Sequence, residues 1–245
     1  MTTTTKTLRQ RIADGEILVA LRGSLWTGKS ELADLWASGE YDYVWIDSQH
    51  TPYSDERLVA FCAAAEALGI DVQIRIPHTR DAHLVGRYLD FGPTAVLVPE
   101  VEDVATVDDA IAHAYYGPIG RRSWGGLLRR NFSPEMDRLD YAAWWNEYVV
   151  LGIQVESVRA VEHVSELAKP GVSVVTFGPQ DLAFSLDANP DFPVQSVDDC
   201  IRKVAEDLDG TGIRLAMGLA TPPEERDKYL DMGITLFQEE MPGRP

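Results

Sequence analysis

Short apolar runs of strand length recur eight times along this chain, and between them lie segments whose apolar residues have helical spacing. Most of the runs are continuous rather than alternating, which is typical of parallel strands that are buried on both faces. The predicted strands span residues 17–21, 43–47, 72–76, 95–99, 149–155, 173–177, 214–219 and 234–237. The predicted helices span residues 8–13, 30–38, 54–68, 81–91, 104–113, 158–167, 197–208 and 223–232.

The boundaries of these segments carry residues that start and stop helices. Ser54 precedes Asp55 and Glu56, and Ser196 precedes another acidic turn, as is usual at a helix N-terminus. A glycine stands between many of the helices and the next strand, at positions 69, 92, 171, 212 and 233. Strand and helix that alternate eight times with right-handed crossovers close most simply as a barrel, and a doubly wound open sheet is the alternative.

We therefore predict an α/β fold, a (β/α)8 TIM barrel that forms one domain over residues 1–245. Residues 1–7 are expected to be a loose leader before the first helix. Residues 115–148 form a long connection between the fourth and fifth strands, and we expect an active-site loop there, because long ordered loops commonly form lids or binding walls. The last predicted strand ends at residue 237, so the eighth helix is expected to be short or absent.

Composition and charge restrict the kinds of partner. The chain has 22 basic and 39 acidic residues, a net charge of −17, which argues against nucleic-acid binding and against anionic membranes. No run of 18 apolar residues is present, so no membrane-spanning helix is expected. Two cysteines in a chain of 245 residues are typical of reduced thiols, which predicts a cytoplasmic protein.

Polar residues suited to catalysis lie at the ends of the second and third predicted strands. Catalytic residues of a (β/α)8 barrel gather at the carboxyl ends of its strands. Asp47 and His50 end or follow the second strand: His50 is either a general base whose tautomer Asp47 fixes, or a loop histidine satisfied by the backbone. Arg75 lies in the third strand, where it either holds an oxyanion or carboxylate, or forms a salt bridge inside the barrel.

Two carboxylates lie one β/α unit apart, Glu156 after the fifth strand and Asp181 after the sixth. Neighbouring strands are about 4.8 Å apart, so both side chains can bind one divalent cation, and oxygen ligands favour Mg²⁺ or Mn²⁺. The alternative is that Glu156 caps the next helix and Asp181 caps a turn. Gly178 and Pro179 form either a nest for a substrate carboxylate or an ordinary turn. Arg122, on the long connection, is a further candidate for substrate contact.

Taken together, these residues resemble the HpcH/HpaI family of metal-dependent, pyruvate-using class II aldolases, typified by 4-hydroxy-2-oxoheptanedioate aldolase. The resemblance extends over residues 8–240. It rests on the order and spacing of six segments, namely residues 46–50 (IDSQH), 73–77 (QIRIP), 97–99 (LVP), 120–122 (GRR), 154–156 (QVE) and 177–182 (FGPQDL).

The resemblance implies a TIM barrel in which Glu156 and Asp181 hold Mg²⁺, Mn²⁺ or Co²⁺ against a 2-oxo acid such as pyruvate. It implies that Arg75 stabilises the developing enolate oxygen and that His50, oriented by Asp47, moves protons to and from the aldol hydroxyl. The implied substrate-binding residues are Gln49, Arg122, Gln154, Gly178, Pro179 and Gln180, with backbone N–H groups of residues 180 and 181 holding the carboxylate.

The function implied by the resemblance is a metal-dependent carbon–carbon lyase that joins a pyruvate or hydroxypyruvate enolate to an aldehyde, in a homo-oligomer. The chain departs from the family pattern at Gln49, where the family usually has Glu, at Trp124 after the loop arginine, and at the C-terminal helix. Two alternatives therefore stay open. One is a divergent enolate enzyme (a decarboxylase, a biosynthetic condensing enzyme or a citrate-lyase-like lyase), and the other is a non-catalytic relative that binds a 2-oxo acid.

Overall fold

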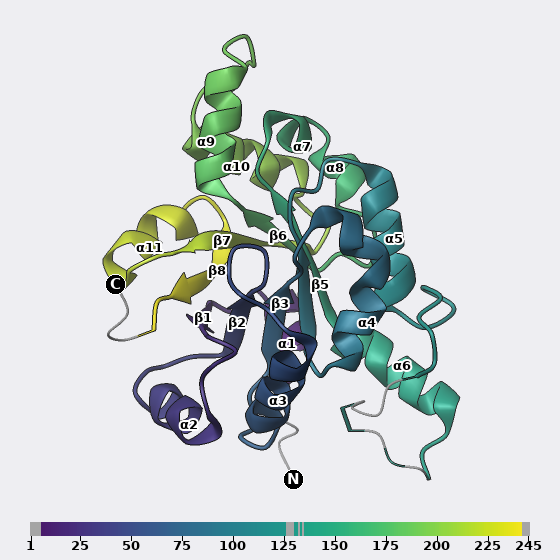
Figure 1. Ribbon diagram of the computed structural model, residues 1–245. Helices are drawn as coiled ribbons and strands as arrows, with labels where there is room; N and C mark the ends of the chain where they lie inside the picture. The colour runs from purple at the N-terminus through teal and green to yellow at the C-terminus, as the bar shows by residue number, and fades with distance from the viewer. Residues whose placement is uncertain (1–5, 126–129, 132, 134, 242–245) are drawn as a thin grey trace.

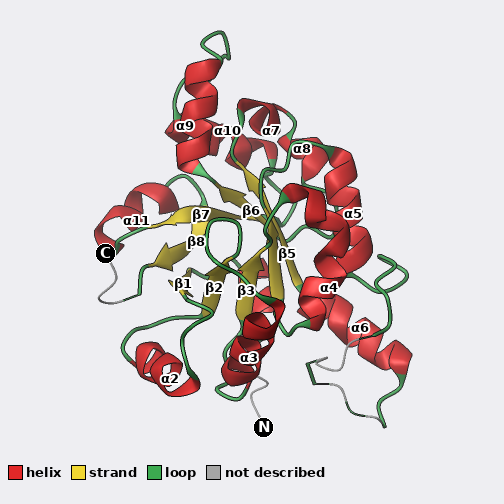
Figure 2. Cartoon of the chain, viewed as in Figure 1, coloured by secondary structure: helices red, strands yellow, loops and turns green. Residues whose placement is uncertain are grey.

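The computed structural model describes residues 6–125, 130–131, 133 and 135–241, in which eight parallel strands form a closed barrel surrounded by helices (Figures 1 and 2). Each strand pairs with its neighbour in the sequence, and β1 pairs with β8. The pairing of β1 with β8 confirms the predicted barrel and excludes an open sheet, because an open sheet leaves two edge strands unpaired.

The eight strands follow the predicted ones closely. They are β1 (Leu18–Arg22), β2 (Tyr43–Asp47), β3 (Val72–Arg75), β4 (Ala95–Val98), β5 (Val150–Val155), β6 (Val174–Phe177), β7 (Arg214–Ala220) and β8 (Ile234–Glu239). The helices are α1 (Leu8–Ala13), α2 (Lys29–Ala37), α3 (Asp55–Glu66), η1 (Thr79–Leu84), α4 (Val85–Asp90), α5 (Val104–Ala114), α6 (Arg138–Tyr148), α7 (Val158–Glu162), α8 (Val164–Leu167), α9 (Pro179–Ala188), α10 (Val197–Asp207) and α11 (Pro223–Leu230).

Alternation along the strands separates two apolar layers. On β2, Val44 and Ile46 belong to the large cluster between the strands and the helices, whereas Tyr43 and Trp45 belong to the cluster inside the barrel. Because side chains of a strand alternate between its two faces, Asp47 continues the inward row. The interior is therefore apolar at the amino ends of the strands and becomes polar at their carboxyl ends.

Two helices lie where the sequence analysis expected none. α9 follows β6 directly, and only Leu182 and Leu186 of its ten residues are buried, so its helical spacing is weak in the sequence. α6 occupies the last part of the long connection 115–148, which is thus not a loop throughout; residues 126–129, 132 and 134 of it lie outside the described residues. Its buried side chains include Tyr141 and Trp145, and aromatic residues give little helix propensity.

Helix α1 closes the amino end of the barrel. Leu8 and Ile12 pack into the interior cluster, and the guanidinium of Arg214 donates to the carbonyls of Ile12 and Ala13. The side chain of Thr7 accepts a hydrogen bond from the N–H of residue 10 and caps the helix, so the predicted leader does not extend to Thr7; residues 1–5 lie outside the described residues.

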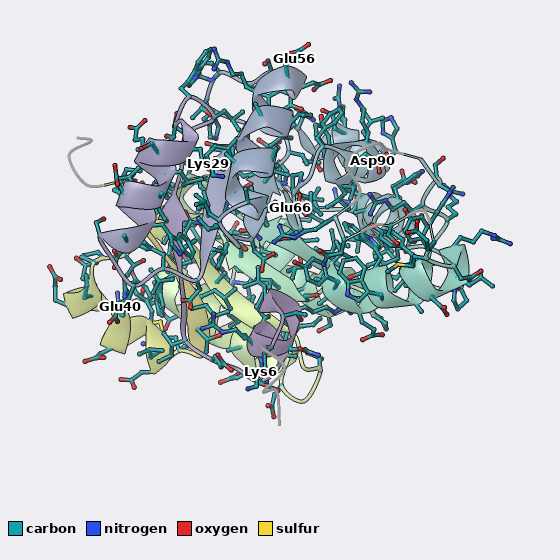
Figure 3. All side chains as sticks on the ribbon, turned by 90° about the horizontal axis from the view of Figure 1, so that it is seen from below. Lys6, Lys29, Glu40, Glu56, Glu66 and Asp90 are labelled. Atoms are coloured by element: carbon teal, nitrogen blue, oxygen red, sulfur yellow. The ribbon has the colours of Figure 1, made fainter. Side chains whose placement is uncertain are left out.

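Charged side chains cover the outside of the molecule, as the net charge requires; Lys29, Glu40 and Glu56 are examples (Figure 3). Within the described part of the chain, no helix is long and apolar enough to cross a membrane. No helix follows β8 in the described residues, which end at Met241.

Candidate active site

The carboxyl ends of β2 and β3 hold a buried ion pair. Asp47 and Arg75 stand opposite each other in the register of the two strands. The guanidinium of Arg75 donates from Nε to Oδ1 of Asp47 (2.9 Å) and from NH2 to Oδ2 (2.7 Å). Burial alone would raise the pKa of Asp47, but the hydrogen bonds and charge of Arg75 hold that pKa below its usual value. Asp47 is therefore ionised at neutral pH and fixes the plane of the guanidinium.

Gln154 connects this ion pair to a second carboxylate. Its Oε1 accepts a hydrogen bond from NH1 of Arg75 (3.4 Å), and its Nε2 donates to Oε2 of Glu156 (2.6 Å). Gln154 and Glu156 lie two residues apart on and just after β5, so both face the barrel interior. The amide of Gln154 thus lies between the cationic Arg75 and the carboxylate of Glu156. Its oxygen accepts from the cation and its NH2 group donates to the carboxylate, as the chemistry of an amide requires.

A turn after β4 completes a ring of hydrogen bonds. The backbone N–H of Glu100 donates to Oε1 of Glu156 (2.8 Å), and Oε1 of Glu100 accepts from Nε2 of Gln49 (3.1 Å). The backbone N–H of Gln49 donates to Oδ1 of Asp47 (2.9 Å), which returns to the first ion pair. Six residues from β2, β3, β4 and β5 are therefore linked in one closed network.

A cavity of about 400 Å³ opens beside this ring. It is lined by Thr79, Glu100, Val101, Glu102, Glu156, Ser157 and Asp181. Burial raises the pKa of Glu156 to about 7, and the negative charge of Asp181 adds to this shift. Four carboxylates, those of Glu100, Glu102, Glu156 and Asp181, thus line one space, and among the hydrogen bonds of the described residues none joins the buried Glu156 to a Lys or Arg.

This donor set fits a divalent cation. A buried carboxylate whose pKa has been raised by burial and by a second carboxylate lacks a positive partner, which a cation would supply. No group of three or more His, Cys, Asp or Glu side chains close enough for a metal occurs among the described residues. Two protein ligands suit Mg²⁺ or Mn²⁺, which commonly keep several waters and bind through one or two carboxylates together with substrate oxygens.

A family model matches residues 26–240, and its description is HpcH/HpaI aldolase/citrate lyase. The chain belongs to this family. The hydroxypyruvate/pyruvate aldolase of Deinococcus radiodurans is 30% identical to it over 223 residues, which are 86% of this chain and 76% of that protein. The protein of the same name from Roseovarius nubinhibens is 29% identical over 94% of this chain and 91% of its own length. A solved structure of a family member from Burkholderia cenocepacia superposes with a TM-score of 0.79 at 27% identity, covering 96% of this chain and 93% of that chain.

Two of the remaining predicted residues also lie at this end of the HpcH/HpaI barrel. Pro179 is the first residue of α9, and Gly178 stands directly before it, against Glu156. A Cβ atom on Gly178 would lie 2.1 Å from Oε2 of Glu156 and 2.7 Å from Nε2 of Gln154. Gly178 therefore allows the backbone to approach the buried carboxylate closely. Ser157, rather than Glu156, caps α7, so the capping alternative for Glu156 is wrong.

His50 is near the site but is not paired with Asp47 as predicted. Both carboxylate oxygens of Asp47 bind Arg75, and among the hydrogen bonds of the described residues none joins Asp47 to His50. His50 is exposed at the mouth of the barrel. The ion pair that the sequence left as an alternative for Arg75 is present, and the charge of His50 contributes only the smallest of the effects that lower the pKa of Asp47.

Arg122 is not brought to this site. Its NH2 donates to Asp90 (2.8 Å), and its guanidinium lies over the ring of Trp145 (4.1 Å). Asp90 ends α4 just before β4, and Trp145 lies on α6 just before β5, so Arg122 lies at the amino ends of the strands. Arg122 is thus held at the opposite end of the barrel from Arg75.

Sequence reasoning missed Glu100. The residue follows the 97–99 segment on which the family resemblance partly rests, and it stands just past the carboxyl end of β4. Its φ of 50° is in the left-handed region that a glutamate rarely adopts. The position after a strand end could have indicated it, but the backbone angle and its contact with Glu156 are visible only in three dimensions.

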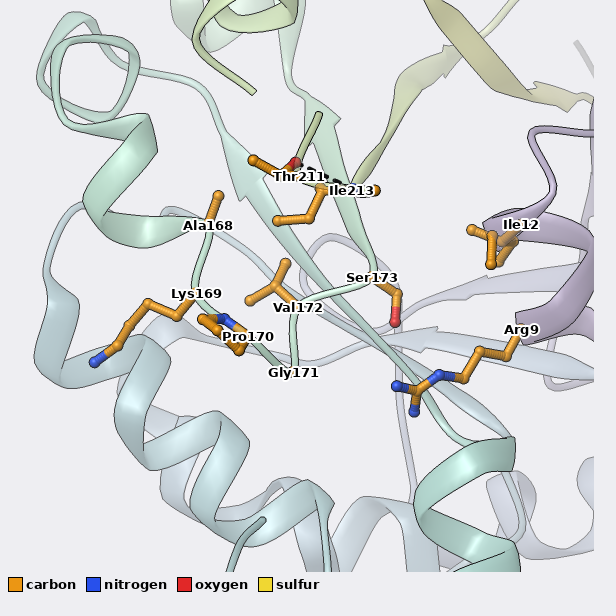
Figure 4. Close-up of a pocket in the computed structure, with 12 residues that line it drawn as sticks. Arg9, Ile12, Ala168, Lys169, Pro170, Gly171, Val172, Ser173, Thr211 and Ile213 are labelled. Atoms are coloured by element: carbon orange, nitrogen blue, oxygen red, sulfur yellow. Dashed lines mark hydrogen bonds between the residues drawn. The ribbon is translucent and has the colours of Figure 1, made fainter. Parts of the chain in front are cut away.

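A second cavity, of about 450 Å³, lies at the amino end of the barrel between α1 and the segments that precede β6 and β7 (Figure 4). Its charged side chains are Arg9 and Lys169. Arg9 donates to the carbonyls of Asn146 and Val149, and Lys169 is paired with Asp108. This cavity has no carboxylate or histidine in its lining, so it lacks the acidic groups that line the cavity at the carboxyl end.

Replacing Gly178 by alanine should weaken cation binding about 10- to 100-fold, because the new Cβ displaces Glu156. The φ of −98° at Gly178 suits alanine, so backbone strain does not contribute. Isothermal titration with Mn²⁺ measures the affinity. Gly28→Ala is the matched control, since a Cβ there meets no atom within 4 Å. Wild-type affinity in the Gly178 variant would contradict the contact with Glu156.

The metal-free protein should lose stability through Glu156 as the pH rises. The folded state keeps this proton up to a pKa of about 7, whereas the ordinary pKa of a glutamate is 4.5. The contribution to stability is therefore complete below pH 4.5 and lost as the pH rises past 7. For such a shift, the free energy of unfolding of wild type relative to Glu156→Gln should fall by about 3 kcal/mol. Urea unfolding with EDTA measures this. A pH-independent difference between wild type and Glu156→Gln would show that burial does not hold the proton.

Proposed function

We propose that this chain is a metal-dependent aldolase, a carbon–carbon lyase that cleaves or forms 4-hydroxy-2-oxo acids through the enolate of pyruvate or hydroxypyruvate. Family membership and relatives named hydroxypyruvate/pyruvate aldolase support an enzyme of this kind with small-molecule substrates. The observation that carries the proposal is Glu156, a buried carboxylate with a raised pKa that shares a cavity with Asp181 and is linked through Gln154 to Arg75.

Glu156 and Asp181 would hold the cation, which is Mg²⁺, Mn²⁺ or Co²⁺. The chemistry that such an ion supplies is Lewis-acid polarisation of the 2-oxo group of the donor acid. The ring of hydrogen bonds fixes Glu156 on both oxygens, through Glu100 and Gln154, so its remaining lone pairs have a defined direction. Metal ligands that are held in this way bind more tightly than free side chains.

Arg75 would stabilise the negative charge that develops on the enolate oxygen. Its guanidinium is held by Asp47 and Gln154 and lies over the ring of Trp45 (5.2 Å), so it needs no rearrangement when the charge appears. Donors organised before the reaction stabilise a transition state more than donors that must first reorient.

The N-terminus of α9 would bind the carboxylate of the donor acid. The first N–H groups of a helix have no partner within the helix, and they carry a partial positive charge. Pro179 has no N–H, so the first free donors are those of Gln180 and Asp181, next to the cavity. His50, exposed at the mouth of the barrel, would transfer the proton of the aldol hydroxyl without the help of Asp47.

A protein that only binds a 2-oxo acid has less support. Binding alone does not require that Arg75 be held by both Asp47 and Gln154. It also does not require a buried Glu156, whose ionised form is destabilised by burial. The homo-oligomer and the cytoplasmic location stay predictions.

Deuterium exchange into the methyl group of pyruvate, followed by NMR, tests the proposal. With Mn²⁺ or Mg²⁺ the methyl signal should disappear, because an enolate forms and is reprotonated from solvent. With EDTA the signal should persist. Exchange that proceeds equally with EDTA would exclude the cation. A lack of exchange under both conditions would exclude pyruvate enolate formation, and an aldehyde screen follows only a positive result.

Replacing Arg75 by lysine should lower the exchange rate by about 10²–10³, because the lysine keeps the charge but loses the planar fork that faces the enolate oxygen. Lysine also keeps a positive partner for Asp47, so the folded state is maintained. Thermal unfolding and Mn²⁺ titration provide the control, and Mn²⁺ affinity should stay within about threefold. A wild-type exchange rate in this variant would refute the role of Arg75.

A further inference from the structure

The carboxamide of Gln49 has one end paired and one end free. Nε2 donates to Oε1 of Glu100 (3.1 Å), while Oε1 of Gln49 is buried and has no hydrogen-bond partner. An ionised carboxylate only accepts hydrogen bonds, so the NH2 group must face Glu100. The carbonyl oxygen of Gln49 therefore has to face the other way.

A buried acceptor without a donor lowers stability unless a ligand supplies the donor. Gln49 lies beside the proposed catalytic groups, because its own N–H binds Asp47, the partner of Arg75. The donor that its free oxygen requires is thus expected from a molecule bound at this end of the barrel. In a 4-hydroxy-2-oxo acid, the group with the right chemistry is a hydroxyl.

Glu100 contacts both the amide of Gln49 and the carboxylate of Glu156. Its backbone has the left-handed φ of 50°, a conformation that is unfavourable for glutamate, and its N–H donates to Oε1 of Glu156. Its side chain lines the cavity and reaches Gln49. One residue thus fixes a proposed cation ligand with its backbone and the amide of Gln49 with its side chain.

We propose that Glu100 is a positioning residue that sets the orientation of the Gln49 carboxamide, so that Gln49 presents its carbonyl oxygen to a hydroxyl of the bound substrate. This inference rests on the function proposed for the same cavity. It also makes residues 49 and 100 interdependent: a glutamate at position 49 would place two carboxylates at hydrogen-bond distance, where like charges repel.

A charge swap tests the pair. In metal-free protein, Gln49→Glu should lower the unfolding temperature by about 3 °C or more, because it creates the repulsion. Adding Glu100→Gln should restore the temperature to near wild type, since the new amide donates to the new carboxylate. For cleavage of a 4-hydroxy-2-oxo acid, kcat/KM should fall at least about tenfold in Gln49→Glu and return to within about threefold in the double variant.

Glu102→Gln is the matched control, because Glu102 lines the same cavity and no hydrogen bond of the described residues joins it to Gln49. In the Gln49→Glu background it should restore much less than Glu100→Gln. Equal rescue by Glu102→Gln, or a double variant as unstable as Gln49→Glu alone, would overturn the pairing. Restored stability without restored kcat/KM would overturn the substrate-facing role.

The proposed aldolase activity and the pairing of Glu100 with Gln49 can be tested separately. Absence of pyruvate exchange in the wild-type protein would count against the proposed aldolase. The unfolding cycle of residues 49 and 100 needs neither cation nor substrate, so it confirms or overturns the pairing of Glu100 with Gln49 in either case.

Discussion

The site depends on the ion pair between Arg75 and Asp47. An arginine at the end of an inward-facing row has to be neutralised, and the opposite register of β2 and β3 supplies a carboxylate that meets two of its nitrogens. Trp45 supports the guanidinium from within the barrel. The third guanidinium nitrogen, NH1, donates to Gln154, and Gln154 in turn donates to Glu156. Removing either member would leave a buried charge without a partner.

The closed barrel explains why the other polar groups meet this pair. Parallel strands bring all their carboxyl ends to one rim, and each row of inward side chains ends there. Residues on or just after four strands then form one ring of hydrogen bonds beside a cavity. The ring satisfies Glu156 with amides rather than with a cationic side chain, which leaves its pKa raised and leaves room for a cation. The same arrangement gives Glu100 two tasks, one for its backbone and one for its side chain.

The predictions that were wrong depend on contacts between distant segments. Asp47 is three residues from His50, but its side-chain partner is Arg75, because the register of β2 and β3 sets Arg75 opposite it. Arg122 follows a motif of the family, yet Asp90 and Trp145 hold it at the amino ends of the strands. Proximity in sequence suggested the first pair, and neither register nor the path of a long connection is encoded in local spacing.

The sequence by itself predicted eight strands and their order, and it placed Asp47, Arg75, Glu156 and Asp181 at or shortly after strand ends, because hydrophobic periodicity and helix-ending glycines are local signals. It favoured a closed barrel, which the pairing of β1 with β8 confirms. The tertiary structure alone decided which of these groups touch. It selected the ion pair for Arg75, the ring that closes through Glu100, and the free oxygen of Gln49. The physical reason is that hydrogen bonds depend on angles and distances of a few ångströms between side chains of different strands, and only the closed barrel sets those.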